Sequence, residues 1–452
     1  MKIQAQESTG KPRAAEDGLQ TSITLPMAFC VSLKQVIGGG VIVLTGTAIA
    51  MTGAGASLAY LLACLVVLLV SLPYAVLGAA RPVSGSLYRW PAQFISPPAG
   101  FMAFWLVLST HVGLAAYAAT FGATLHALLP FLPARPCGLG ALALVLVLNL
   151  LGADVSARAG ILITSAVALA LIGLAVAGLP HVDPHRLTNL FPHGWGGLLG
   201  AAALLTFPIS GATLVSELAG EMRRPGRDIP IAILGATACA ALLYVMVALV
   251  AAGIPPTASA DGRTLSDVAA QVMSPVPLAL FGLGAGIISM FGIMNTHMLW
   301  GSRSVLMVCR DGWLPSLFGK PNRAGAPVWP LLLLSVIGAA PVVAGLDVAS
   351  IIRVSALGAS ASAMLSVACA PLNAWRNPQA YAASPLPVPV AVLVAVSLAA
   401  IASQIATFVL LMRDLPLRLV LIWVGWVLLG LLIAAIRYAG VRQRLADRRS
   451  TP

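Results

Sequence analysis

The chain has 452 residues, of which 59% are hydrophobic and only 9% are charged. Soluble globular domains carry about 25% charged residues, so we expect most of this surface to face lipid. The formal net charge of +12 does not indicate nucleic-acid binding, because the basic residues stand singly between apolar runs. The six cysteines are isolated and show no metal-binding spacing. We therefore expect neither a metal nor a cofactor.

About twelve apolar segments follow one another along the chain. A membrane-spanning helix needs about 20 mostly apolar residues, and the runs are continuously apolar, which favours helices over a barrel. We expect one transmembrane domain, residues 25–440, with tails at 1–24 and 441–452. The predicted spans are 25–52, 57–80, 100–129, 136–153, 159–179, 195–219, 229–253, 276–308, 328–346, 348–371, 387–411 and 416–438.

The basic residues predict the orientation of these spans. Of the 26 Lys and Arg residues, nineteen fall on the side of both termini and five on the opposite side, while Lys34 and Arg353 fall within spans. Cytoplasmic loops carry such an excess. We therefore expect a multi-pass protein of the cell (inner or plasma) membrane, with both termini cytoplasmic. No feature of the sequence indicates an oligomeric state.

The first span contains residues that interrupt a helix. Gly38, Gly39 and Gly40 stand together in its interior, and each glycine there costs about 1 kcal/mol relative to alanine. This pattern predicts an unwound turn. The alternative is a close helix–helix contact, for which membrane proteins also use small residues.

The sixth span is interrupted over residues 207–211. Pro208 removes a backbone donor, and Gly211 loosens the chain just after it. A simple proline kink is the alternative to unwinding. Spans 1 and 6 are the first helices of two five-helix halves, and interruptions at matching positions in two halves indicate a transporter site.

An unwound turn would determine the chemistry of such a site. Its amide donors, next to the positive end of a half-helix, are suited to a carboxylate. Carbonyls freed in the other broken helix can accept from an ammonium group. A molecule that carries both groups about two bonds apart is an α-amino acid.

Several motifs occur in order along the chain. They are Ile37-Gly38-Gly39-Gly40-Val41; Pro82-Val83-Ser84-Gly85-Ser86-Leu87-Tyr88 with Gly100-Phe101 and Trp105; Glu221-Met222-Arg223-Arg224-Pro225 with Asp228-Ile229-Pro230; and Ser302-Arg303 with Arg310-Asp311-Gly312-Trp313-Leu314-Pro315 and Ala326-Pro327-Val328. The ordered set resembles the amino acid–polyamine–organocation (APC) family of transporters. This resemblance implies an all-α polytopic, leucine-transporter-like fold. Helices 1–5 and 6–10 would form an inverted repeat with helices 1 and 6 broken, and the substrate would move by alternating access.

The resemblance also implies which residues bind the substrate. Its carboxylate would be held by the amides of Ile37, Gly38, Gly39 and Gly40. Its amino group would be held by the carbonyls of Phe207, Ser210 and Gly211. Phe207 would also close over the substrate, Ala115 would face it, and His297 falls where some members place an aromatic residue. Gly85-Ser86, Phe104, Ile209 and Thr213 depart from the common family residues, so the substrate is not assigned by analogy.

Three ionisable residues within predicted spans are candidates for coupling transport to an ion. Lys34 precedes the glycines by one turn, His111 precedes Ala115 by one turn, and His297 lies in the eighth span. Intramembrane ionisable groups are costly and mark functional sites by default, and histidine titrates in the physiological range. The structural alternatives are a lysine that extends to the interface and histidines that are satisfied inside the bundle.

No Asp or Glu falls near a predicted membrane centre. We therefore predict a transporter of neutral amino acids, working by proton symport or by exchange. A cationic amino acid or polyamine antiporter is the alternative, with an aromatic face such as Phe207 replacing the missing counter-charge. A non-transporting amino acid sensor is another. An enzyme is not expected, because the chain shows no nucleophile–base spacing, phosphate loop or metal motif.

Overall fold

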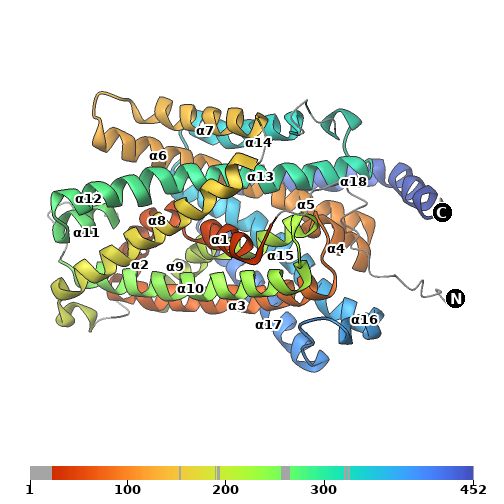
Figure 1. Cartoon of the computed structure of the whole chain (residues 1–452), viewed down its shortest axis with the longest axis horizontal. Coiled ribbons are helices and arrows are strands. Elements are labelled where there is room, and N and C mark those ends of the chain that lie inside the picture. The colour runs from red at the N-terminus through yellow and green to blue at the C-terminus, as the bar shows by residue number, and fades with distance from the viewer. Residues whose placement is uncertain are drawn as a thin grey trace.

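The computed structural model describes residues 23–151, 154–188, 190, 194–255, 265–319, 322 and 326–450. All named elements in these ranges are helices, and most run along the long axis of the molecule (Figure 1). The α-helices are α1 Leu25–Val36, α2 Gly39–Thr52, α3 Ala56–Ala80, α4 Ser86–Phe94, α5 Pro97–Thr110, α6 Gly113–Leu128, α7 Ala134–Leu150, α8 Asp154–Gly178, α9 Gly194–Ile209, α10 Pro225–Gly253, α11 Leu265–Val272, α12 Pro275–Phe281, α13 Ser289–Arg310, α14 Val328–Val343, α15 Val348–Arg376, α16 Pro378–Ala382, α17 Val390–Arg413 and α18 Leu417–Ser450.

Shorter helices of other types join or extend these elements. They are the 3-10 helices η2 Gly53–Gly55, η3 Leu179–His181, η4 Pro184–Leu187, η5 Ser210–Glu221 and η7 Ser316–Gly319, and the π-helix η6 Gly282–Ile288. Within the described ranges, nine helical segments are long and apolar enough to cross a membrane. The shorter apolar helices α1, α7 and α14 fall on predicted spans 1, 4 and 9. The predicted polytopic all-α membrane fold is therefore confirmed.

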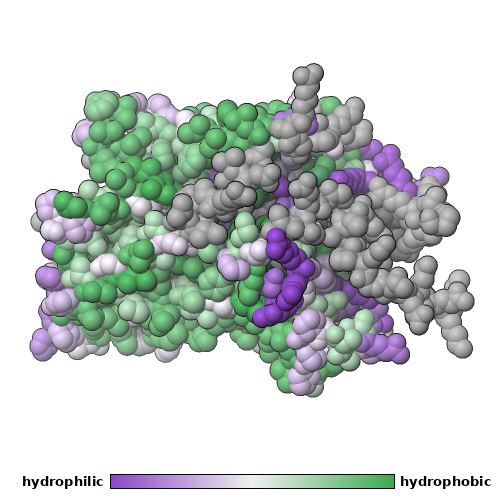
Figure 2. All heavy atoms as spheres, viewed as in Figure 1, coloured by the Kyte–Doolittle hydropathy of each residue, from purple (hydrophilic) through white to green (hydrophobic). Residues whose placement is uncertain are grey.

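The surface has the polarity that lipid requires. Figure 2 shows apolar residues over a broad area of the helices, with hydrophilic residues at the left end, toward the right and in one group near the lower middle of the view. Large apolar side chains are exposed on α10, α17 and α18, for example Leu242, Leu398 and Ile436. Exposed apolar side chains on this scale indicate contact with lipid or with another protein.

The first span is broken, as predicted. Helix α1 ends at Val36 and α2 begins at Gly39, and Gly38 between them is extended, with φ −139° and ψ −172°. The Val36 carbonyl accepts a hydrogen bond from the Tyr244 hydroxyl of α10, which replaces a bond within the helix. The break is shorter than expected, since Gly39 and Gly40 already belong to the first turn of α2. Amides of a first turn have no partner within the helix in any case.

The sixth span is also interrupted within residues 207–211, by a change of helix type and not by an open turn. Helix α9 continues to Ile209, and the chain then narrows into the 3-10 helix η5. Hydroxyl groups compensate for the change of pattern: the Ser210 hydroxyl donates to the Phe207 carbonyl at 3.1 Å, and the Thr213 hydroxyl donates to the Ser210 carbonyl at 3.1 Å. A 3-10 helix of 12 residues is unusually long, and such stretches often mark hinges.

Four further features were not predicted. The third span is split at His111 and Val112, between α5 and α6, and the eighth contains the π-helix η6 between α12 and α13. Helix α18 continues to Ser450, beyond the predicted end of the last span at residue 438. The short helix α4 buries Trp90 and Phe94 and pairs with α5 in a hairpin.

Candidate functional site

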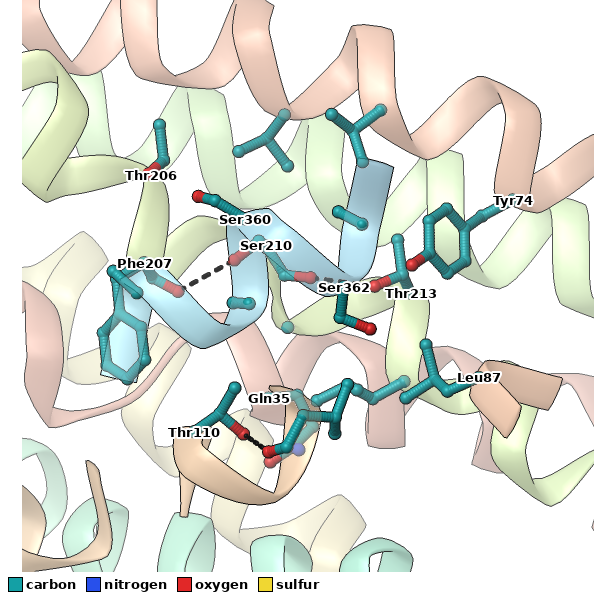
Figure 3. Close-up of a pocket in the computed structure, with 18 of the residues that line it drawn as sticks. Gln35, Tyr74, Leu87, Thr110, Thr206, Phe207, Ser210, Thr213, Ser360 and Ser362 are labelled. Atoms are coloured by element: carbon teal, nitrogen blue, oxygen red, sulfur yellow. Dashed lines mark hydrogen bonds between the residues drawn. The ribbon is translucent and has the colours of Figure 1, made fainter. Parts of the chain in front are cut away.

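A cavity of about 90 Å³ lies where the two interrupted spans meet (Figure 3). One water molecule needs about 10–15 Å³ measured in this way, so the cavity has room for a small solute. Its walls come from α1, α3, α4, α5, α6, α9, η5, α13, α15 and α17. The lining residues are Gln35, Val67, Val70, Tyr74, Leu87, Val107, Thr110, Tyr117, Thr206, Phe207, Ser210, Gly211, Thr213, Leu214, His297, Trp300, Ala356, Ala359, Ser360, Ser362, Ala363 and Gln404.

The two interrupted spans touch at the edge of this cavity. A β-carbon placed on Gly211 would lie 2.4 Å from the backbone carbonyl oxygen of Gln35. One turn earlier in α1, the Ser32 hydroxyl donates to the Ala212 carbonyl at 3.4 Å. The end of α1 and the start of η5 therefore pack backbone against backbone, and only glycine fits at position 211.

Polar atoms without a protein partner gather on the cavity wall. Within the described part of the chain, no hydrogen-bond partner is found for Gln35 Oε1 and Nε2, Ser362 Oγ, His297 Nδ1 or Trp300 Nε1. A buried polar group left unpaired costs about 1–3 kcal/mol, and native proteins contain few of them. Their concentration at one cavity indicates a place where a polar solute or water completes the hydrogen bonding.

The structure brings together only part of the predicted substrate site. Phe207, Ser210, Gly211 and His297 line the cavity, and Phe207 stacks on Tyr117 with ring centroids 6.4 Å apart. Of the other residues predicted to face the substrate, Ile37, Gly38 and Ala115 are not part of this wall, and the surroundings of Gly39 and Gly40 lie outside what the structure describes. Gly38 is covered by α13, because a β-carbon there would lie 2.5 Å from Ile293 Cδ1.

The coupling candidates occupy different positions. His297 lies on the cavity wall, whereas His111 lies behind it, with its ring 5.9 Å from that of His297. Trp300 contacts both rings, at 4.7 Å from His111 and 5.3 Å from His297. Lys34 is buried at 5% exposure but is not part of the wall. Only His297 is therefore placed to contact a bound solute directly.

The cavity wall carries no formal charge among the described residues. None of the lining residues is Asp, Glu, Lys or Arg. The buried carboxylate of Glu217 is connected to the cavity wall through Leu87. It accepts hydrogen bonds from the Leu87 amide at 2.7 Å and from the Ser86 hydroxyl at 2.8 Å. The Ser304 hydroxyl of α13 donates to its other oxygen. Glu217 thus links η5 to α4 and α13 through hydrogen bonds, and both of its carboxylate oxygens already accept from protein donors.

Sequence reasoning missed several residues of the wall. Gln35, two residues before the glycine motif, had no assigned role, and Ser360, Ser362 and Gln404 were not singled out within their apolar spans. A signal was present, since polar side chains inside a membrane span usually face the bundle interior or a polar cavity. Which of them face the same cavity depends on how distant spans pack, and that is not local information.

The chain was compared with known proteins. The family model described as amino acid permease matches residues 23–436. The chain is 30% identical over 322 residues to the branched-chain amino acid permease BcaP of Bacillus subtilis (strain 168), an alignment that covers 64% of this chain and 67% of that protein. It is 29% identical over 308 residues to the methylthioribose transporter of the same organism, covering 63% and 66%.

A plant protein is also similar. The chain is 28% identical over 331 residues to the cationic amino acid transporter 3, mitochondrial, of Arabidopsis thaliana, covering 68% of this chain and 54% of that protein. These relatives are permeases and transporters, which agrees with the prediction that the chain is not an enzyme. The match over nearly the whole length, together with the broken first helix and the cavity beside it, leads to one assignment. The chain belongs to the amino acid permease family, within the APC transporters.

Proposed function

We propose that this protein carries a neutral α-amino acid across the cell membrane by alternating access around the cavity. The observation that supports this most strongly is a wall of unpaired but uncharged polar groups, with no Asp, Glu, Lys or Arg among its described residues. A cationic substrate side chain would enter this cavity without a counter-charge. The named relatives transport both classes, since one is a branched-chain and another a cationic amino acid transporter.

The two interruptions suit the two ends of an amino acid. The first amides of α2, which follow Gly38, have no partner in their own helix, and we infer that they bind the carboxylate once the packing of Ile293 on Gly38 opens. The Phe207 and Ser210 carbonyls each accept one hydroxyl bond. Both carbonyls lie in helical segments, so we infer that an ammonium group reaches them by displacing the Ser210 and Thr213 hydroxyls.

Alternating access requires one element to move against another. The long 3-10 helix η5 and the break at Gly38 supply two hinges at matching positions, and the Gln35–Gly211 contact makes α1 and η5 move together. We infer that they swing as one unit, with proton symport or exchange as the source of energy and His297, His111 and Lys34 as the candidate proton carriers. We also propose that both termini are cytoplasmic.

Uptake into proteoliposomes tests this function. Purified protein would be reconstituted and supplied with each of the twenty labelled amino acids and with putrescine, with and without a pH gradient and with and without unlabelled amino acid inside. We expect saturable uptake of neutral amino acids. Uptake confined to lysine, arginine or putrescine would support the cationic alternative instead, and binding without uptake would support a sensor.

A further inference from the structure

Gln35 is a buried carboxamide that the proposed function does not yet use. It lies in the last turn of α1, is 4% exposed and forms part of the cavity wall. Neither its Oε1 nor its Nε2 has a hydrogen-bond partner among the described residues. A glutamine can donate and accept at once, so an unpaired one on a cavity wall is suited to a ligand that offers both functions.

The cavity is longer than the backbone part of an amino acid. Its lining residues run from Thr206 to Leu214 along the sixth span and from Ala356 to Ala363 along α15. The α15 stretch covers about two turns, or about 11 Å of α-helix, and the sixth-span stretch is longer because it is 3-10 helix from Ser210, which rises about 2.0 Å per residue. The cavity therefore has the length to take the side chain of an amino acid in addition to its amino group.

The walls near Gln35 offer neutral hydrogen-bonding groups from separate helices. Ser362 of α15 is 1% exposed and its hydroxyl has no partner in the described ranges, and Gln404 of α17 is 6% exposed on the same cavity. Figure 3 shows Gln35, Ser362 and Thr213 around the central part of the cavity. The Thr213 hydroxyl already donates to the Ser210 carbonyl, so it offers only its lone pairs.

We propose that Gln35 hydrogen-bonds the side chain of the substrate, with Ser362 in support, and that the preferred substrates are neutral amino acids carrying a hydroxyl or carboxamide group. This inference rests on the proposed function. A site built to hydrogen-bond a substrate group discriminates strongly against an isostere that lacks it, because its own polar atoms are then left unpaired. This preference for polar side chains differs from the preference for branched-chain amino acids that the name of the Bacillus subtilis relative BcaP indicates.

Competition between isosteric amino acids tests the inference in proteoliposomes. Uptake of labelled threonine would be competed with unlabelled threonine or valine, asparagine or leucine, and glutamine or methionine. We expect the polar member of each pair to compete at roughly tenfold lower concentration. Preference for the apolar members would overturn the inference while leaving amino acid transport intact. If none of the twenty amino acids is taken up, the proposed function itself fails.

Variants separate direct contact from a structural role. We expect Gln35→Leu and Ser362→Ala to reduce the preference for polar over apolar competitors, and Gln35→Glu to bring in uptake of lysine and ornithine through the new carboxylate. Gln271→Leu is the matched control, because Gln271 lies on α11 away from the cavity and bonds the Asp267 carbonyl. The inference would be overturned if the variants lost affinity equally for the polar and the apolar member of each pair and if Gln35→Glu gained no lysine uptake. Ser362→Ala decides the question if the Gln35 variants do not fold.

Discussion

The carbonyl oxygen of Gln35 lies against the α-carbon of Gly211, so close that a β-carbon at position 211 would sit 2.4 Å away. This contact joins the end of the first half-helix of span 1 to the start of the 3-10 segment of span 6. Both residues also line the cavity. The interrupted elements are thus not two separate irregularities, because they meet at one point beside the place where a solute would bind.

Replacing Gly211 should break this contact. Gly211→Ala would place a β-carbon against backbone atoms of Gln35 that cannot move aside, and we expect transport to fall at least tenfold. Gly196→Ala is the control on the same span, since a β-carbon there would meet nothing within 4 Å. Uptake measured beside the amount of folded protein checks both variants, and a Gly211→Ala protein as active as Gly196→Ala would show that the contact is not needed.

Gly38→Ala should have a milder effect than Gly211→Ala. The neighbour of Gly38 is the flexible end of the Ile293 side chain, 2.5 Å from a new β-carbon. Shortening that side chain should therefore relieve the overlap. We expect Ile293→Val to restore part of the activity lost in Gly38→Ala and to restore none in Gly211→Ala. Uptake by the two double variants measures this difference.

The two buried histidines should differ in what they control. His297 lines the cavity, and His111 lies behind it with Trp300 against both rings. We expect His297→Ala to change the order of preferred substrates or the pH dependence of uptake. We expect His111→Ala to change the maximal rate without changing substrate order. His185→Ala, at an exposed position of the 3-10 helix η4, is the control. If His297→Ala changes neither property, His297 has no role in the site.

Glu217 should contribute more to stability than Glu221. Glu217 is buried and accepts hydrogen bonds from the Leu87 amide and from the Ser86 and Ser304 hydroxyls. Glu217→Ala would leave these donors unpaired, at a cost of about 1–3 kcal/mol for each buried group. Glu221 pairs with Arg303 at 3.0 Å, with both side chains partly exposed, and such pairs contribute about 0–1 kcal/mol. Thermal unfolding in detergent compares the variants, and equal melting temperatures would refute the difference.

Asp347 should make stability weakly dependent on pH. It precedes α15, outside the spanning segment, and accepts from the Ser350 amide at 2.7 Å. Burial raises the pKa of Asp347, but the Ser350 hydrogen bonds and the Arg353 charge outweigh it, so its pKa lies below the ordinary value. Because the pKa of Asp347 is lower in the folded state, its ionised carboxylate stabilises the fold at pH values above the unfolded-state pKa, which is about 3.9. This stabilisation is lost as the pH falls through the lower pKa of the folded state.

The Asp347→Ala variant tests this. At pH 7 we expect it to lose about 1 kcal/mol of stability, the usual effect of removing a helix N-cap. The difference in stability between Asp347→Ala and the unmodified protein should become smaller as the pH is lowered toward about 3. A difference that stays constant over this range would show that the charge of Asp347 contributes nothing.

The sequence predicted the backbone irregularity of the first span well because its cause is local. Three adjacent glycines weaken a helix wherever they occur, and the break falls at Ile37 and Gly38. The sixth span was harder, because Pro208 and Gly211 disfavour an α-helix without specifying what replaces it. The hydroxyls of Ser210 and Thr213, together with the contact at Gln35, favour a 3-10 helix over an open turn.

The cavity wall was less predictable than the breaks. Phe207 and His297 were found through motifs, but Gln35 and Ser362 come from helices far apart in sequence, and only packing shows that they share a cavity. The same holds for Gly38, whose amide was expected to face the substrate and which lies under Ile293. Side-chain neighbours across distant spans are not encoded in any local pattern.

A structure of the protein with its transported amino acid bound would test the account most directly. We predict that the amino acid lies between Gln35, Phe207, Ser210 and His297, with its carboxylate toward the start of α2 and its side chain within reach of Gln35. An amino acid bound elsewhere in the bundle, with these residues contacting only one another, would contradict the central claim.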